Sequence, residues 1–186
     1  PMFALSAITA VAAFATQGLA FVSLPFFFEQ VLHRDPVQTG VMMSFWPIFV
    51  AVLAPWAGRL SDRYPPGLLG GVGLVVLSIG MAALAWMPSA PSSLDIGIRM
   101  AICGVGFSIF QAPNLKAIMS SAPSNRSGGA SGVIGVARLL GQSSGAALVA
   151  LCFHLSGTHG PLLALGIGAV TAGLARSEEH TSELQS

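Results

Sequence analysis

Residues 67–87 read GLLGGVGLVVLSIGMAALAWM, a run without a charged side chain in which Ser78 is the one clearly polar residue. A helix needs about 20 consecutive apolar residues to cross the hydrocarbon core of a bilayer. The run is apolar on all sides, so it lacks the alternation of the about 10-residue strands in membrane barrels. It therefore predicts a membrane-spanning helix.

Similar apolar runs lie on both sides of this one, separated by breaks rich in proline, glycine and other turn residues, such as Tyr64-Pro65-Pro66-Gly67. The sequence predicts an all-α membrane protein with six transmembrane helices. The expected spans are 2–28, 38–57, 67–87, 95–120, 129–153 and 155–175.

The composition excludes an ordinary soluble domain. Charged residues make up 8% of the chain and hydrophobic residues 53%, whereas soluble domains carry about 25% charged residues. This small number of charged side chains cannot solvate the surface of a soluble fold. The expected solvent is therefore the bilayer. We therefore expect no soluble enzyme.

The basic residues predict the orientation of the spans, because Lys and Arg gather in short cytoplasmic loops. The second and fourth connections, with the adjoining helix ends, hold Arg59, Arg63, Lys116 and Arg126. The other connections hold two arginines, each close to an aspartate: Arg34 and Arg99. This asymmetry places the second and fourth loops, and both ends of the chain, in the cytoplasm.

Polar residues at depth occur in some spans and not in others. The third and sixth spans hold little beyond Ser78 and Thr171, which predicts that they face lipid. The first two spans of each group of three have members that could line a cavity. Two groups of three helices in opposite orientation form a plan used by transporters.

The sequence at each end of the chain leads to a further prediction. Pro1 leads directly into an apolar run without a basic segment or a cleavage site, so we expect the chain to begin within a longer protein. Residues 176–186 resemble the in-frame translation of a sequencing-library adapter and bring three glutamates into a region almost free of charge. We expect this tail not to be native.

Several stretches resemble one transporter family. Gly58-Arg59-Leu60-Ser61-Asp62-Arg63 resembles the Gly-x-Leu-x-Asp-Arg loop signature of the major facilitator superfamily, although the usual glycine and basic run do not follow it. Four other stretches of the sequence resemble the fourteen-helix drug:proton antiporter branch of this superfamily. The stretches that carry this likeness are SLPFFF at 23–28, FSIFQAPN at 107–114, SGGASG at 127–132 and RLLGQ at 138–142.

The resemblance covers residues 2–175 and implies the last six helices of a transporter with two bundles. It implies export of a small lipophilic substrate in exchange for protons, across a bacterial inner membrane. The expected partners are the lipid bilayer and an N-terminal bundle of the same chain. The alternatives are a major facilitator importer of a sugar or metabolite, or a membrane anchor or scaffold subunit.

Arg138 is the first candidate for the substrate path. It lies about nine residues into its span, on the order of 14 Å deep, and a charge at that depth usually marks a functional site. A structural tie between bundles is the alternative. Its partner is expected to be water, a backbone carbonyl or a carboxylate outside this chain, because no acid of this sequence has a matching depth.

Four amides are further cavity candidates. Gln111 and Asn114 flank Pro113 on one face of the fourth span; alternatively, they satisfy carbonyls that the proline leaves free. Gln17 and Gln142 either line the cavity or form hydrogen bonds between helices.

The loop motif Gly58, Arg59, Asp62 and Arg63 is either a solvated loop or a conformational latch. In the latch, the Asp62 carboxylate meets a helix N-terminus and stabilises one state. Small residues of the fifth span, with Gly141 and Gly145 among them, predict close helix packing.

No carboxylate is buried within a span, so we expect the proton-coupling acid in the absent N-terminal half. The histidines have no partners at metal-ligand spacing, and the glycines at 70–73 lie inside an apolar helix. We therefore expect no metal, cofactor or nucleic acid.

Overall fold

The computed structural model describes residues 2–88, 90–120, 127–156 and 160–183. Its described residues form six helices and no strand, which confirms the all-α prediction. Five of these helices are long and apolar enough to cross a membrane, and the apolar part of the sixth is the shorter segment Gly160–Ala175. The α-helices are α1 (Met2–Phe26), α2 (Pro36–Ser61), α3 (Pro66–Ala85), α4 (Ser93–Ser120), α5 (Ser127–Ser156) and α6 (Gly160–Glu183).

The helices begin and end at residues with clear capping roles. Asp35 caps α2 by accepting hydrogen bonds from the backbone N–H groups of Val37 and Gln38, and Pro36 follows at the first helical position, where its missing N–H costs nothing. Pro66 starts α3 in the same way. Helix α2 begins at Pro36 and ends at Ser61, so it is longer than the expected span 38–57.

The first helix also extends beyond its expected end at Phe28. Pro25 lies inside α1, and a five-residue π-helical turn η1 (Phe27–Val31) follows it. A proline removes one backbone hydrogen bond, and a π turn is one way for a helix to absorb such a defect. His33 then adopts a positive φ of 50° and turns the chain toward α2.

The end of the bundle also differs from the expected boundaries. Helix α5 continues to Ser156 and α6 begins at Gly160, so Leu155 belongs to the fifth helix and not to the sixth. Residues 157–159 and the predicted loop residue Arg126 lie outside the described part of the chain. The backbone of α6 is helical as far as Glu183.

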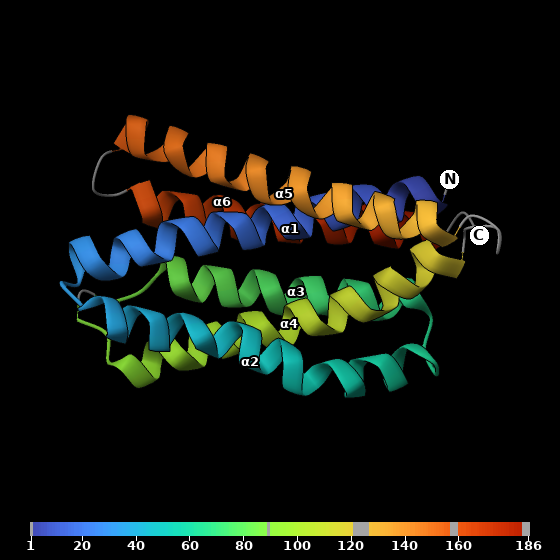
Figure 1. The fold of residues 1–186 in the computed structure, drawn as a ribbon, viewed down its shortest axis with the longest axis horizontal. Helices are drawn as coiled ribbons and strands as arrows, with labels where there is room; N and C mark the ends of the chain where they lie inside the picture. The colour runs from blue at the N-terminus through green and yellow to red at the C-terminus, as the bar shows by residue number, and fades with distance from the viewer. Residues whose placement is uncertain (1, 89, 121–126, 157–159, 184–186) are drawn as a thin grey trace.

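The two groups of three helices are interlaced. Helix α1 packs mainly on α5 and α6, while α4 packs mainly on α2 and α3, and α3 also packs on α6. The first helix of each group thus contacts the second helix of the other group, as the order of the helices across Figure 1 shows. This exchange, with α1 and α4 running in opposite directions, matches the predicted inverted repeat of three plus three helices.

The core lies where α1, α3, α4 and α6 meet. Among its fully buried side chains are Leu24 of α1, Leu77 of α3 and Phe107 of α4. Helix α3 combines this buried side with an apolar outer side, on which Val72 and Ile79 are exposed. Gly73 lies on the buried side against the backbone of Phe110, so the glycines of this helix serve packing with α4 rather than facing lipid throughout.

Helices α1 and α5 approach especially closely. A Cβ on Gly18 would lie 2.7 Å from the backbone oxygen of Gln142, and one on Gly141 would lie 2.6 Å from the backbone oxygen of Val11. This confirms the predicted close packing at Gly141. The same prediction included Gly128 and Gly132, and there it is wrong, because a Cβ on either glycine would meet no described atom within 4 Å.

The connections gather at the two ends of the bundle as the charge pattern requires. The start of α1, the α2–α3 connection, the end of α4 and the start of α5 lie at one end (Figure 1). At the opposite end Arg34 Nη2 donates to the backbone oxygen of Pro91 at 2.9 Å. There Arg99 pairs with Asp95 of the same helix at 3.0 Å and donates to the backbone oxygen of Ala83 of α3. Arg34 and Arg99 thus each connect two segments at that end of the bundle.

Candidate functional site

Gln17 and Gln142 form a polar contact between α1 and α5 inside the apolar bundle. The Gln142 Nε2 atom donates to Gln17 Oε1 at 3.2 Å. The contact is possible because Gly18, beside Gln17, lets the two backbones approach. Of the two roles predicted for these residues, hydrogen bonding between helices is the one seen here. Both side chains remain partly exposed.

Gln111 and Asn114 border a small cavity between three helices. The cavity measures about 20 Å³, enough for a single water molecule. Neither amide has a hydrogen bond to any residue within the described ranges, so they do not satisfy the carbonyls near Pro113. The cavity is lined from α1, α4 and α5 by Ala10, Phe14, Phe110, Gln111, Asn114, Leu115, Ile118 and Ile134.

Arg138 lies on the open side of α5. It is exposed, whereas the preceding Ala137 is buried against the bundle. It stands 11 residues after the start of the helix at Ser127, which corresponds to about 17 Å along the axis. In the part of the chain that the structure describes, its guanidinium has neither a hydrogen-bond nor an ion-pair partner. The structure therefore presents a charge well inside the length of α5, on a surface that no described helix covers.

The loop motif lies at the end of α2. The Asp62 backbone N–H closes the last turn of that helix, and the Asp62 carboxylate meets Lys116 Nζ at 2.5 Å. Lys116 also donates to the backbone oxygen of Ser61 at 3.2 Å. The partner of this carboxylate is thus an ammonium near the C-terminal end of α4 and not the helix N-terminus that the latch hypothesis expected.

The remaining motif residues play smaller parts in this structure. Gly58 accepts a hydrogen bond from the Ser61 hydroxyl at 2.7 Å, and the Arg59 guanidinium lies 6.0 Å from the centre of the Trp56 ring. The Arg63 side chain is exposed beside them. Lys116 itself was predicted on the same side of the membrane, but its contact with Asp62 was not predicted.

An aromatic cluster is the part of the site that the sequence did not reveal. Trp46 of α2 is fully buried, with its ring centre 5.5 Å from that of Phe21 and 6.3 Å from that of Phe107. Phe14 lies 5.6 Å from Phe107 on the other side. The Trp46 Nε1 atom has no hydrogen-bond partner among the described residues. The aromatic residues stand on three different helices, so no spacing within one span could have identified the cluster.

Taken together, the four amides and Arg138 of the candidate site lie on α1, α4 and α5, and the aromatic cluster extends the same region to α2. The groups at depth are amides, one unpaired guanidinium and aromatic rings. Such groups can bind and orient a lipophilic solute with few polar atoms. The carboxylates of Glu29, Asp35, Asp62 and Asp95 all lie at or near helix ends, and none of these four lies midway along a described helix.

Comparison with known proteins gives the family that the sequence motifs resemble. The model of the Major Facilitator Superfamily matches residues 1–146. The Uncharacterized transporter YebQ of Escherichia coli (strain K12) is 50% identical over 175 residues, which is 92% of this chain and 38% of that protein.

More distant relatives carry names that refer to cargo. The Riboflavin transporter RibZ of Clostridioides difficile (strain 630) is 25% identical over 157 residues, covering 84% of this chain and 34% of that protein. The Multidrug resistance protein Stp of Mycobacterium tuberculosis (strain ATCC 25618 / H37Rv) is 28% identical over 152 residues, covering 81% of this chain and 28% of that protein. The chain thus spans well under half the length of these relatives.

Proposed function

The chain belongs to the major facilitator superfamily, and on that premise we propose that it is the C-terminal six-helix bundle of an exporter of lipophilic small molecules. Export proceeds by alternating access, with protons moving in the opposite direction. The α2–α3 connection, the end of α4 and the two chain ends face the cytoplasm of a bacterial inner membrane. An N-terminal bundle of the same protein completes the substrate path.

The exposed Arg138 is the observation that carries this proposal. An isolated charge at mid-depth costs several kcal/mol in a bilayer, so it requires water or a partner outside the described helices. A membrane anchor has no use for such a residue, whereas a substrate path between two bundles supplies both water and partners. The open sides of α2 and α5 supply the surface on which the second bundle packs.

The cargo follows from the balance of aromatic and polar groups. The cluster around Trp46 and Phe107 is apolar, and the polar groups near it are few and mostly uncharged. The multidrug name of the mycobacterial relative supports the same cargo class. The riboflavin name of the clostridial relative supports a second candidate, a transporter of a single aromatic metabolite.

Proton coupling is assigned to the remainder of the protein. Asp62 and Asp95 are paired with Lys116 and Arg99 at the helix ends, and Asp35 caps α2. We therefore place the coupling carboxylate on the N-terminal bundle, at a depth that matches Arg138.

The test uses the full-length protein in everted membrane vesicles, with ethidium as the lipophilic probe and a proton gradient as the energy source. Arg138→Gln is expected to abolish most of the uptake, and Arg138→Lys to retain part of it because it keeps the charge. Leu139→Ala, at the next and also exposed position, is the matched control and should transport normally. Unchanged uptake by Arg138→Gln would contradict the role of the arginine.

The same vesicles separate the alternative functions. Uptake that survives collapse of the proton gradient would rule out proton antiport. Ethidium that is ignored while riboflavin is transported would favour the metabolite transporter. No transport of either probe by correctly inserted full-length protein would favour an anchor.

A further inference from the structure

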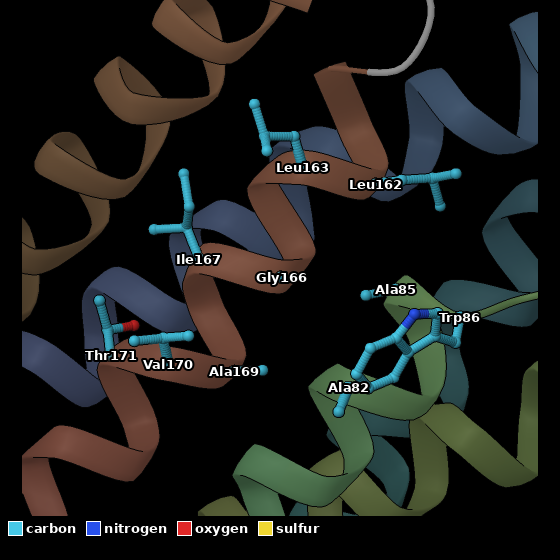
Figure 2. Close-up of a pocket in the computed structure, with 10 residues that line it drawn as sticks. All are labelled: Ala82, Ala85, Trp86, Leu162, Leu163, Gly166, Ile167, Ala169, Val170 and Thr171. Carbon is cyan, nitrogen blue, oxygen red and sulfur yellow. The ribbon is translucent and has the colours of Figure 1, made fainter.

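A second hollow lies between α3 and α6, away from the polar residues of the proposed substrate path. Its volume is about 560 Å³. Figure 2 shows Ala82 and Ala85 of α3, with Trp86 directly after that helix, across from Gly166 and Ala169 of α6. Small residues on both helices leave the space open, while Trp86 stands at its end with 82% of its surface exposed. We refer to this hollow as the α3–α6 groove.

The lining of the α3–α6 groove offers almost no polar group to a ligand. The one hydroxyl in it belongs to Thr171, whose Oγ1 atom donates to the backbone oxygen of Gly168 at 3.0 Å. The same atom lies 3.1 Å from the Thr16 hydroxyl of α1. Sites for specific small molecules contain a few polar groups that fix the orientation of the ligand. The groove therefore fits a flexible apolar chain rather than an oriented solute.

The length and position of the groove define that chain further. Its α6 side runs from Leu162 to Thr171, which is about 14 Å along the helix and about half of the 30 Å hydrocarbon core of a bilayer. It begins at the helix ends next to the α3–α4 connection, where Trp86 occupies the usual place of an aromatic residue at the membrane interface. The groove is thus as deep as one lipid leaflet.

The surroundings of the groove are apolar as well. Val72 and Ile79 of α3 and Leu174 of α6 are exposed on the same two helices, and together they form an outer surface suited to lipid. We propose that the α3–α6 groove binds one acyl chain of a phospholipid in the leaflet next to the α3–α4 connection. This inference requires the proposed placement of α3 and α6 against lipid, but it does not depend on any transport activity.

A substitution at Gly166 can fill the α3–α6 groove. A Cβ at this position would meet no described atom within 4 Å, so a larger side chain enters the groove without colliding with the bundle. Gly166→Leu fills much of the space and Gly166→Ala little of it. Ala82→Leu fills the groove from α3, in case the first variant fails to fold. Val72→Phe adds bulk to the same outer side of α3 but far from the groove.

The experiment uses the full-length protein in vesicles of phosphatidylethanolamine and phosphatidylglycerol, with a trace of phosphatidylethanolamine that carries a diazirine in its acyl chain. After irradiation, labelled peptides are mapped by mass spectrometry. We expect labelling to concentrate on residues 82–86 and 162–171. Gly166→Leu and Ala82→Leu should lose this labelling, whereas Gly166→Ala and Val72→Phe should keep most of it.

Three outcomes would overturn the proposal. Labelling spread evenly over the exposed sides of α3 and α6 would indicate ordinary surrounding lipid. Labelling that Gly166→Leu and Ala82→Leu leave unchanged would show that the groove is covered by another helix or is empty of lipid. A pattern that disappears when the same acyl chain is carried by phosphatidylglycerol would show recognition of the headgroup instead. Labelling near Val72 verifies membrane insertion in every variant, and none of these results depends on transport.

Discussion

Lys116 Nζ lies 2.5 Å from Asp62 Oδ1 and thereby links the C-terminal part of α4 to the end of α2. Both side chains are well exposed, at 50% and 68% of their surface, so the pair contributes only about 0.2–1 kcal/mol to stability. A contact of this strength can form and break during a transport cycle.

Asp62→Asn is therefore expected to slow transport without preventing membrane insertion or folding. Lys116→Met should have a similar effect, and the exchanged pair Asp62→Lys with Lys116→Asp should restore part of the rate. Transport is measured in vesicles of the full-length protein, with the amount of inserted protein as the control. Normal transport by Asp62→Asn would exclude the latch.

Removing the Gln17–Gln142 hydrogen bond is expected to destabilise the packing of α1 on α5. Hydrogen bonds between membrane helices contribute about 0.6–2 kcal/mol. Gln17→Ala and Gln142→Ala should each lower stability by this order, and the double variant should cost less than the sum of both. Unfolding of the purified full-length protein in detergent measures the three losses, and strict additivity would show that the two amides do not interact.

Two glycines allow a matched test of the helix contacts. Gly141→Ala adds a methyl group that would lie 2.6 Å from Phe14 Cβ, and such overpacking typically costs about 1–3 kcal/mol. Gly166→Ala adds the same group into open space and should be neutral or slightly stabilising. Thermal denaturation of both variants compares them directly, and equal midpoints would contradict the close approach of α1 and α5.

The N-cap of α2 gives a prediction that does not involve transport. Asp35→Ala removes the acceptor for the N–H groups of Val37 and Gln38, which should lower stability by about 1 kcal/mol. Asp35→Ser keeps a capping oxygen and should retain most of that stability. Denaturant unfolding of the full-length protein distinguishes the two variants; the same loss in both would show that the cap hydrogen bonds are unimportant.

The positions of the helices could be predicted from the sequence because length and hydropathy are properties of single segments. The packing partners could not. Nothing in the sequence around Gln17 reveals that α1 packs against α5. The sequence therefore leaves two roles open for Gln17 and Gln142, lining a cavity or forming a hydrogen bond between helices. The grouping of Lys116 with the loop of Asp62 followed from charge alone, but their contact depends on α2 lying beside α4.

The hydropathy pattern also could not predict local details of the backbone. The π turn after Pro25 and the extension of α5 to Ser156 depend on hydrogen bonding at the helix ends. Arg138 lies 11 residues after the start of α5, close to the nine residues expected from the sequence, because this position is a count along the chain. The sequence could not predict which side of α5 Arg138 occupies, because that side depends on the packing of Ala137 against the bundle.

The interlacing of the two helix groups has a consequence for biosynthesis. Gln17 and Gln142 are 125 residues apart, and at typical rates of synthesis this separation corresponds to a delay on the order of ten seconds. Throughout that interval α1 has been made while its partner has not. Until α5 is made, the Gln17 amide lacks this partner. Because α1, α2 and α3 pack mainly on helices of the second group, the first three helices cannot complete their packing before the second three are made.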